Sequence, residues 1–164
     1  MAPNPPAGSS EGASWYERIP PPVWFFGCLG AGWGLDKTFP LSIPFPSLGW
    51  QLVPALLLFA TATGLAVWTM RLFHLRRTTV LPFGVATALL TTGPYRLSRN
   101  PLYVATVATL VAFGLLLGTY WVLLSAAALV LALDRLVIPG EEAVLAGVFG
   151  NDYANYARRV RRWL

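Results

Sequence analysis

The sequence predicts an all-α integral membrane protein with about four transmembrane helices. Of the 164 residues, 55% are hydrophobic and only 12% are charged, whereas about a quarter of an ordinary soluble domain is charged. The hydrophobic residues fall into four stretches, which we take as spans. Eleven of the twelve basic residues then lie on one side of the membrane. That distribution is typical of cytoplasmic membrane loops rather than of a nucleic-acid-binding face.

The first span follows a tail, residues 1–22, whose proline, serine and glycine content predicts flexibility. The span covers residues 23–39 at most, because its helix ends either near Leu35 or closer to Phe39. Small residues permit close packing of helices in lipid, and this span contains Gly27, Gly30, Gly32 and Gly34. A proline-rich loop after Lys37 leads to the next span.

Three further spans are predicted over residues 50–73, 101–118 and 120–138. The first of these is long enough to cross a hydrocarbon core of ~30 Å. Pro101 suits the first turn of a helix, where its missing N–H would have no partner anyway. Gly118 begins a tight turn, and Pro139-Gly140 is expected to stop the last span. The third and fourth spans therefore form a helical hairpin.

The C-terminal residues 141–164 are predicted to form cytosolic helices. Residues 141–149 have a helical pattern, and Gly150 resembles a helix C-cap. A final helix then carries one apolar stripe beside four arginines, made of Tyr153, Tyr156, Val160 and Trp163. We expect it to lie at the surface of an anionic leaflet, and packing on the rest of the protein is equally compatible with the pattern.

The charge distribution predicts that both termini are cytoplasmic and that residues 23–164 form a single domain. Lys37 is the only basic residue expected on the opposite side. Arginine outnumbers lysine eleven to one, which is typical of a GC-rich bacterial genome. We therefore expect a bacterial inner membrane protein whose partner is the bilayer rather than a nucleic acid. The pattern leaves the oligomeric state open.

Two kinds of catalytic site are disfavoured by the scarcity of their residues. Cys28 is the only cysteine and His74 the only histidine, so the chain offers no thiolate metal cluster. A Ser-His-Asp triad or a histidine metal site would need His74 itself. We expect no metal site and no nucleophile of the protein's own.

Polar residues instead concentrate at the cytosolic end of the hairpin. The segment 93–103 reads GPYRLSRNPLY, and two charged pairs, Asp134-Arg135 and Glu141-Glu142, follow the fourth apolar stretch or lie within it. Because the third and fourth spans are antiparallel, the start of one must lie near the end of the other. The sequence therefore predicts a cytosolic pocket for a small, partly anionic cofactor.

The ordered pattern Gly-Pro-Tyr-x-x-x-Arg-Asn-Pro-x-Tyr, Glu-Glu, Phe-Gly-x-x-Tyr and a basic tail resembles a known family. It is similar to the isoprenylcysteine carboxyl methyltransferase and phospholipid methyltransferase family of integral membrane enzymes, over roughly residues 50–164. The resemblance implies S-adenosylmethionine-dependent methyl transfer to a membrane-soluble acceptor, which is a lipophilic small molecule or a lipid.

The resemblance also implies a set of cofactor-binding residues. They are Thr87 to Leu90, Tyr95, the run Asn100, Pro101, Leu102 and Tyr103, and Glu141. Two positions depart from the isoprenylcysteine enzymes. Asn100 replaces a histidine and can hydrogen bond but not become cationic. Val137 stands where those enzymes carry a substrate-binding arginine, which argues against a prenylcysteine carboxylate as the acceptor.

The chemistry of the cofactor agrees with these residues. Arg99 or Arg96 can pair with its carboxylate, and the tyrosines can pack on its adenine or sulfonium. The acceptor can be a lipid amine, a carboxylate or a thiol, and an amine needs a base. The candidate catalytic residues are therefore Asp134 and Glu142 as bases, together with Arg135, which is paired with Asp134. Ionisable groups at the depth of Asp134 are functional candidates.

Each of these residues also has a structural interpretation. Arg96 and Arg99 suit membrane anchors, Asn100-Pro101 suits a helix start, and Glu142 suits a solvated first helical turn. The alternative function is a non-catalytic membrane scaffold or a transporter-like subunit, which the glycine-rich first span and the basic C-terminal helix favour. Cofactor binding distinguishes that alternative from an enzyme.

Overall fold

A computed structural model describes residues 19–76 and 88–164. Its elements are α1 (Pro21–Thr38), α2 (Leu48–Arg76), the short 3-10 helix η2 (Gly93–Arg96), α3 (Pro101–Leu117), α4 (Tyr120–Ala132), the π-helical turn η3 (Leu133–Val137) and α5 (Ile138–Arg159). The all-helical fold class is confirmed, and the helices predicted over residues 23–39, 50–73 and 101–118 are present. The predicted tail ends slightly too late, because the first turn of α1 accommodates Pro21.

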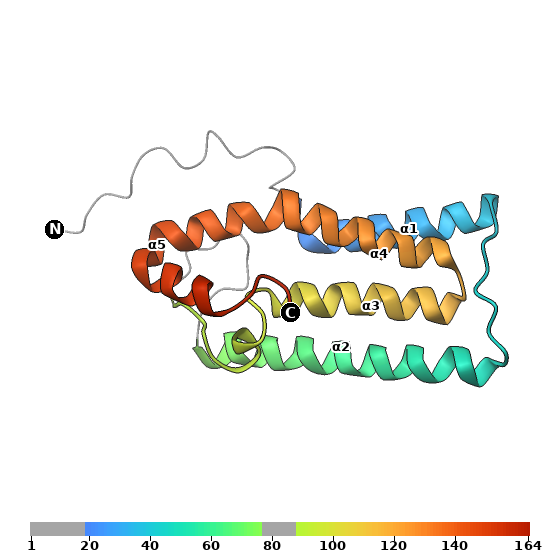
Figure 1. Cartoon of the computed structure of the whole chain (residues 1–164), viewed down its shortest axis with the longest axis horizontal. Helices are drawn as coiled ribbons and strands as arrows, with labels where there is room; N and C mark the ends of the chain where they lie inside the picture. Colours follow the sequence, from blue (N-terminus) through green and yellow to red (C-terminus); the bar gives the residue numbers. More distant parts are fainter. Residues whose placement is uncertain (1–18, 77–87) are drawn as a thin grey trace.

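Helices α2, α3 and α4 form a row in that order, and α1 packs against α4 and also contacts α3 (Figure 1). The hairpin of α3 and α4 is therefore flanked on both sides. Most of the buried apolar cluster belongs to this hairpin and to η3, and its members are Tyr103, Leu110, Val122, Ala126, Leu129, Leu133, Val137 and Ile138. Residues at the end of the hairpin are thus held by the best-packed part of the fold.

Two glycines set the distances between neighbouring helices. A Cβ atom at Gly32 of α1 would lie 2.9 Å from the Cα atom of Val122 in α4. A Cβ atom at Gly114 of α3 would lie 2.6 Å from Leu123 Cδ2. Close packing through the glycines of the first span is therefore confirmed at Gly32. For Gly27, by contrast, no described atom lies within 4 Å of the Cβ position.

The loop after α1 docks on the turn between α3 and α4, and we call this region the loop end. The Asp36 carboxylate accepts a hydrogen bond of 2.6 Å from the Thr119 hydroxyl and one from the Leu41 amide. Gly118 adopts a positive φ of 66° and ends α3. The Trp121 indole donates to the Phe39 carbonyl at 2.6 Å.

The fourth helix does not stop at Pro139-Gly140, so that prediction is wrong. Instead, α4 continues through η3 into α5, and the Ile138 amide bonds to the carbonyl of Leu133, five residues earlier. Proline normally breaks a helix because it lacks an N–H and clashes with the preceding turn. The wider π turn relieves that conflict, and Pro139 lies in the first turn of α5.

The final helix is shorter than predicted. Gly150 has φ 50° and ψ −121°, which kinks α5 and confirms the expected break at this glycine. The helix ends at Arg159, and Val160 is extended. Val160 and Trp163 therefore do not continue the helical stripe of Tyr153 and Tyr156. Both tyrosines are buried against the rest of the protein.

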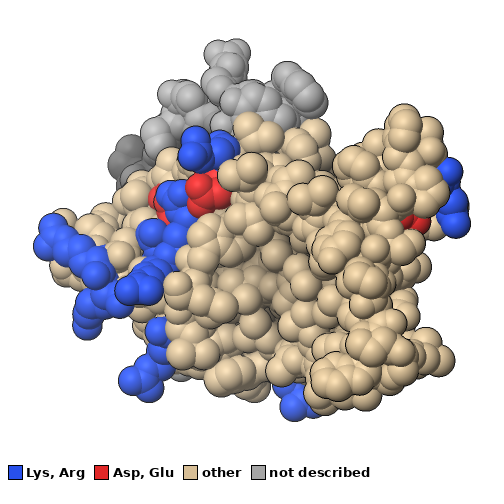
Figure 2. Space-filling model, turned by 45° about the vertical axis from the view of Figure 1, so that its right-hand side comes forward, with Lys and Arg blue, Asp and Glu red and all other residues tan. Residues whose placement is uncertain are grey.

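Large apolar side chains cover the outer faces of the row. Examples in α2 are Trp50, Leu57 and Trp68, each more than half exposed. The visible face in Figure 2 has wide areas without charge, while basic side chains gather towards one side. Two helical stretches, Leu48–Leu75 and Tyr120–Phe149, are long and apolar enough to cross a membrane, and Pro101–Leu117 is a shorter apolar helix.

Candidate active site

Opposite the loop end, residues 88–100 meet α5 and the C-terminus, and we call this region the polar end. Gly93 has φ 61° and starts η2, which directs Tyr95 towards the helices. The Tyr95 ring meets Phe73 of α2 edge to face, with ring centroids 6.1 Å apart. The Tyr156 hydroxyl donates to the Tyr95 carbonyl at 2.7 Å. Residues 88–100, which we call the connector, are thereby held between α2 and α5.

The hairpin brings the start of α3 to the start of α5, as its antiparallel geometry requires. The buried Tyr103 hydroxyl donates to Glu141 Oε1 at 2.7 Å.

Tyr95 lies near this pair, and its pKa is raised by burial, with smaller contributions from Tyr156 and from the Glu141 carboxylate. The Tyr95 phenol therefore stays protonated and can serve as a hydrogen-bond donor.

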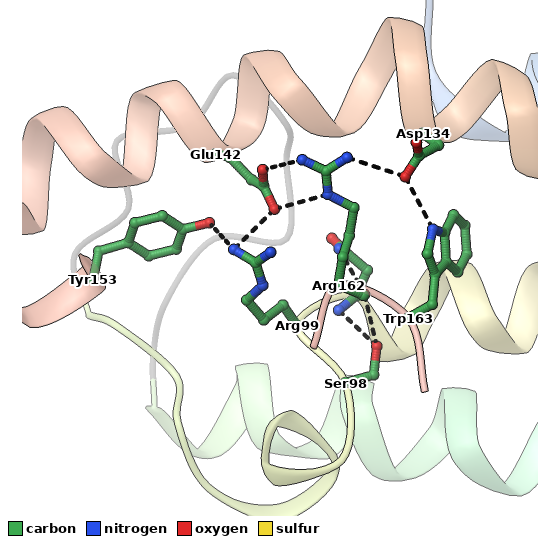
Figure 3. Close-up of polar contacts among 8 residues, drawn as sticks. Ser98, Arg99, Asp134, Glu142, Tyr153, Arg162 and Trp163 are labelled. Carbon is green, nitrogen blue, oxygen red and sulfur yellow. Dashed lines mark hydrogen bonds and ion pairs between the residues drawn. The ribbon is translucent and has the colours of Figure 1, made fainter. Parts of the chain in front are cut away.

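A charged network lies beside this pair (Figure 3). Arg99 Nη1 lies 3.0 Å from Glu142 Oε1 and donates to the Tyr153 hydroxyl at 3.2 Å. Arg162 donates to both oxygens of Glu142, at 3.2 and 2.6 Å, and to Asp134 Oδ1 at 3.1 Å. Glu142 is thus shared by two guanidinium groups that come from distant parts of the chain.

Asp134, on the π turn, has a second partner from the C-terminus. The Trp163 indole donates to Asp134 Oδ1 at 3.0 Å. The adjacent Arg135 contributes less, because its Nε lies 3.5 Å from Asp134 Oδ2 and 77% of its side chain is exposed. The predicted Asp134-Arg135 pair is therefore secondary to the contacts of Asp134 with Arg162 and Trp163.

The last residues also bind the backbone that precedes α3. The Arg99 amide donates to the Arg161 carbonyl at 2.9 Å. The Arg162 carbonyl accepts from the Ser98 hydroxyl and from Asn100 Nδ2, both at 3.1 Å. The side chain of Asn100, a predicted cofactor residue, is thus engaged by the C-terminus.

The other predicted residues lie as follows. Pro101 is buried in the first turn of α3, Leu102 follows it half-buried, and Leu90 is buried in the connector. Thr87 lies outside the described residues. The structure thus brings together two neighbouring groups: Tyr103 with Glu141, and Arg99 with Glu142 and Asp134.

Sequence reasoning did not select Ser98, Tyr153, Arg162 or Trp163, which all belong to the charged network. One signal was available for Arg162. An acidic residue inside an apolar helix needs a cationic partner, and four arginines cluster near the C-terminus. Asp134 was paired with the adjacent Arg135 in the prediction, so none of the C-terminal arginines was considered as its partner.

An open cavity of about 740 Å³ lies between the connector and the end of α5. Arg96, Thr91 and Tyr156 are among its lining residues, together with Asp152 and Val160. Its volume falls within the range of small-molecule sites. Arg96, the alternative partner for a cofactor carboxylate, faces this cavity, whereas Arg99 belongs to the charged network.

Two polar groups at the polar end are left with bonding capacity. Arg99 Nε is buried without a hydrogen-bond partner among the described residues, and such orphaned donors in native structures require an explanation. In the described part of the chain, the hydrogen bond to Glu141 uses Oε1 and leaves Oε2 available. A ligand that carries both an anionic acceptor and a polar donor would satisfy the two groups.

Comparison with known proteins places the chain in a family. A family model described as phospholipid methyltransferase matches residues 50–152, more than half of the chain. No curated protein and no solved structure gives a significant match. The matched range includes most of α2, the hairpin and both glutamates. Together with the apolar helices, the match indicates an integral membrane protein with methyltransferase activity on a lipid-type substrate. The chain belongs to the phospholipid methyltransferase family.

Proposed function

We propose that the protein uses S-adenosylmethionine to methylate a lipid amine at the membrane surface. The observation that carries this proposal is the convergence of Glu141 and Glu142 with Tyr103 and Arg99 at one end of the hairpin. Arg99 and Tyr103 lie directly before α3 and in its first turn, and the two glutamates lie at the start of α5, all within the range that matches the family.

The residues at the polar end fit the cofactor's functional groups. The orphaned Arg99 Nε suits a carboxylate oxygen, and a guanidinium pairs well with that group. The available oxygen of Glu141 suits the amino group or the ribose diol. Tyr95 offers an aromatic face for the adenine or for the sulfonium. The cofactor supplies an activated methyl group, so the protein's main tasks are to align donor and acceptor and to exclude water.

An amine is the acceptor that best suits the charges of this site. Glu142 and Asp134 present carboxylates beside the start of α3, and carboxylates attract an ammonium and repel an anion. The amine must lose a proton before it attacks, and Asp134 or Glu142 can take that proton. Val137 stands where the isoprenylcysteine enzymes carry an arginine, which also disfavours a carboxylate acceptor. A thiol attacks as its thiolate, an anion that the carboxylates of Glu142 and Asp134 would repel.

We place the protein in the membrane with four spans, from α1, α2, α3 and the helix that contains α4. Residues 23–164 then form one domain, with both termini on the cytoplasmic side of a bacterial inner membrane. This orientation puts the arginine-rich polar end in the cytoplasm. The cofactor enters from the cytosol, and the lipid acceptor arrives from within the bilayer.

The test is cofactor binding followed by product identification. Purified protein in detergent should bind S-adenosylmethionine and S-adenosylhomocysteine saturably. Membranes incubated with methyl-labelled cofactor should yield a labelled lipid amine, identified by its mass. Absence of saturable binding contradicts the proposal. A non-catalytic scaffold would show neither binding nor any dependence of its function on Glu141.

A further inference from the structure

Residues 160–164, which we call the C-terminal strap, fold back from the end of α5 onto the charged network. The strap is extended rather than helical. Its backbone accepts hydrogen bonds from the Arg99 amide, the Ser98 hydroxyl and Asn100 Nδ2. Chain termini are poorly ordered unless something ties them down. These contacts tie the strap to residues that we assign to the active site.

The side chain of Arg162 is the centre of the strap's contacts (Figure 3). It bridges the carboxylates of Glu142 and Asp134, at 2.6 and 3.1 Å. Its hydrogen bonds to Glu142 are the largest cause of a raised pKa for the Arg162 guanidinium. Arg162 is therefore a permanent cation held between two anions.

The same two carboxylates are those that we assign to an acceptor ammonium. Glu142 already binds the guanidinium groups of Arg99 and Arg162, so it has little capacity left for a third cation. With the strap in place, both oxygens of Glu142 are engaged by arginine. Binding of the strap and binding of an amine headgroup at this pair therefore exclude each other.

We propose that the C-terminal strap is an internal competitor of the acceptor, and that an amine headgroup displaces Arg162 from Glu142 and Asp134. This inference rests on the proposed function, because it takes the two carboxylates as the acceptor's site. The competitor and the acceptor carry the same charge, so the exchange leaves neither carboxylate unpaired. The strap shields the carboxylates until a cationic headgroup arrives.

The surroundings of the strap suit displacement. The side chains of Arg162, Asp134 and Glu142 are 31%, 26% and 19% exposed, and ion pairs that water reaches are weak. Val160, at the start of the strap, lines the open cavity beside α5. Trp163 packs on the buried cluster and donates a hydrogen bond to Asp134. Release of the strap therefore requires that these contacts of Trp163 break as well as those of Arg162.

The experiment measures release of the strap in nanodiscs that differ in one chemical group. Phosphatidylglycerol discs contain a fixed fraction of either phosphatidylethanolamine or N-acetyl-phosphatidylethanolamine, in which the amine carries no charge. The rate at which carboxypeptidase removes the C-terminal residues is followed by mass spectrometry. We expect removal to be about three- to tenfold faster with the free amine, in line with weak, partly exposed ion pairs.

Two variants and a matched control sharpen the result. Arg162→Gln should be digested rapidly in both kinds of disc, and Trp163→Phe should shift the rate in the same direction by less. Arg158→Gln makes the same change of charge at an exposed residue of α5 and should behave like the native protein. The thermal unfolding midpoint of each variant shows whether it is folded.

Equal digestion of the native protein in both discs would overturn the inference, as would an Arg162→Gln variant that stays as protected as the native chain. Cofactor binding and methyl transfer are measured in the same discs. If the amine releases the strap and no methyl is transferred, the proposed function fails and the strap inference stands. If methyl transfer occurs without strap release, the strap inference alone fails.

Discussion

The two ends of the helical row use carboxylates in different ways. At the loop end, Asp36 bonds to the Thr119 hydroxyl and the Leu41 amide, and these neutral donors attach a loop to a turn. At the polar end, Glu142 is shared by Arg99 and Arg162, and Arg99 Nε is buried without a partner among the described residues. The buried, unpaired donor of Arg99 therefore distinguishes the candidate site from the structural contact. Substitutions at the two ends should separate activity from stability.

The largest effect is expected from Glu141→Ala at the polar end. The substitution removes the acceptor of the Tyr103 hydrogen bond and the oxygen that we assign to the cofactor. Hydrogen bonds to charged groups contribute about 1.5–3 kcal/mol, so affinity for S-adenosylmethionine should fall by roughly tenfold to a hundredfold. Titration calorimetry in detergent measures this. Glu141→Gln, which keeps an acceptor for Tyr103, should bind better than Glu141→Ala, and equal affinity of both variants and the native protein would contradict the assignment.

Arg99→Lys should have the next largest effect. Lysine keeps the charge, and its single nitrogen can replace Arg99 Nη1, which alone contacts both Glu142 and Tyr153. It lacks the rest of the guanidinium fork, including the orphaned Nε donor. We expect methyl transfer to fall on the order of tenfold, because a charge-assisted hydrogen bond is lost. Initial rates with labelled cofactor measure the change, and full activity of Arg99→Lys would assign Arg99 to anchoring alone.

Gly32→Leu tests the helix contact near the loop end. The new side chain would start 2.9 Å from Val122 Cα, so α1 must move away from α4. Overpacking of this kind destabilises by about 1–3 kcal/mol. The thermal unfolding midpoint should fall, while cofactor affinity measured below that midpoint should be retained. Gly27→Leu is the matched control, because no described atom lies within 4 Å of its Cβ position.

Thr119→Val should have the smallest effect. It removes the hydroxyl that donates to Asp36 and that accepts from the Trp121 amide at the start of α4. Loss of such an N-cap costs about 1 kcal/mol, which a modest fall of the unfolding midpoint would report. Thr119→Ser keeps the hydroxyl and should lie close to the native protein. A loss of activity larger than the loss of stability would mean that the loop end also serves the reaction.

Helix positions were predictable because the apolar stretches and their boundary residues act locally. Pro101 starts α3 and Gly118 ends it, as their backbone preferences require. The meeting of Tyr103 and Glu141 followed from the antiparallel hairpin. Each of these inferences needs a short segment or a single pairing of helices.

The predictions that were wrong or incomplete depend on backbone and tertiary contacts that a short segment does not specify. Pro139 was expected to end a helix, and the π turn that accommodates it depends on an i to i+5 bond that residue preferences do not specify. Trp163 was assigned to a helical stripe, whereas it leaves the helix to bond with Asp134. Tertiary contacts outweigh the periodic pattern there. Arg162 was missed because its partners lie 20 and 28 residues away.

The π turn also sets the rotation between the two halves of the long helix. Residues before it, such as Val122 and Leu129, are locked in the buried cluster, while Glu141 and Glu142 lie beyond it. Each residue of an α-helix advances the chain by about 100°. Deleting or inserting one residue within η3 would therefore rotate Glu141 and Glu142 around the helix axis, and it would also disturb the packing of Leu133, Val137 and Ile138 in the buried cluster. Relatives that differ in length at this turn would present a different polar face on the same scaffold.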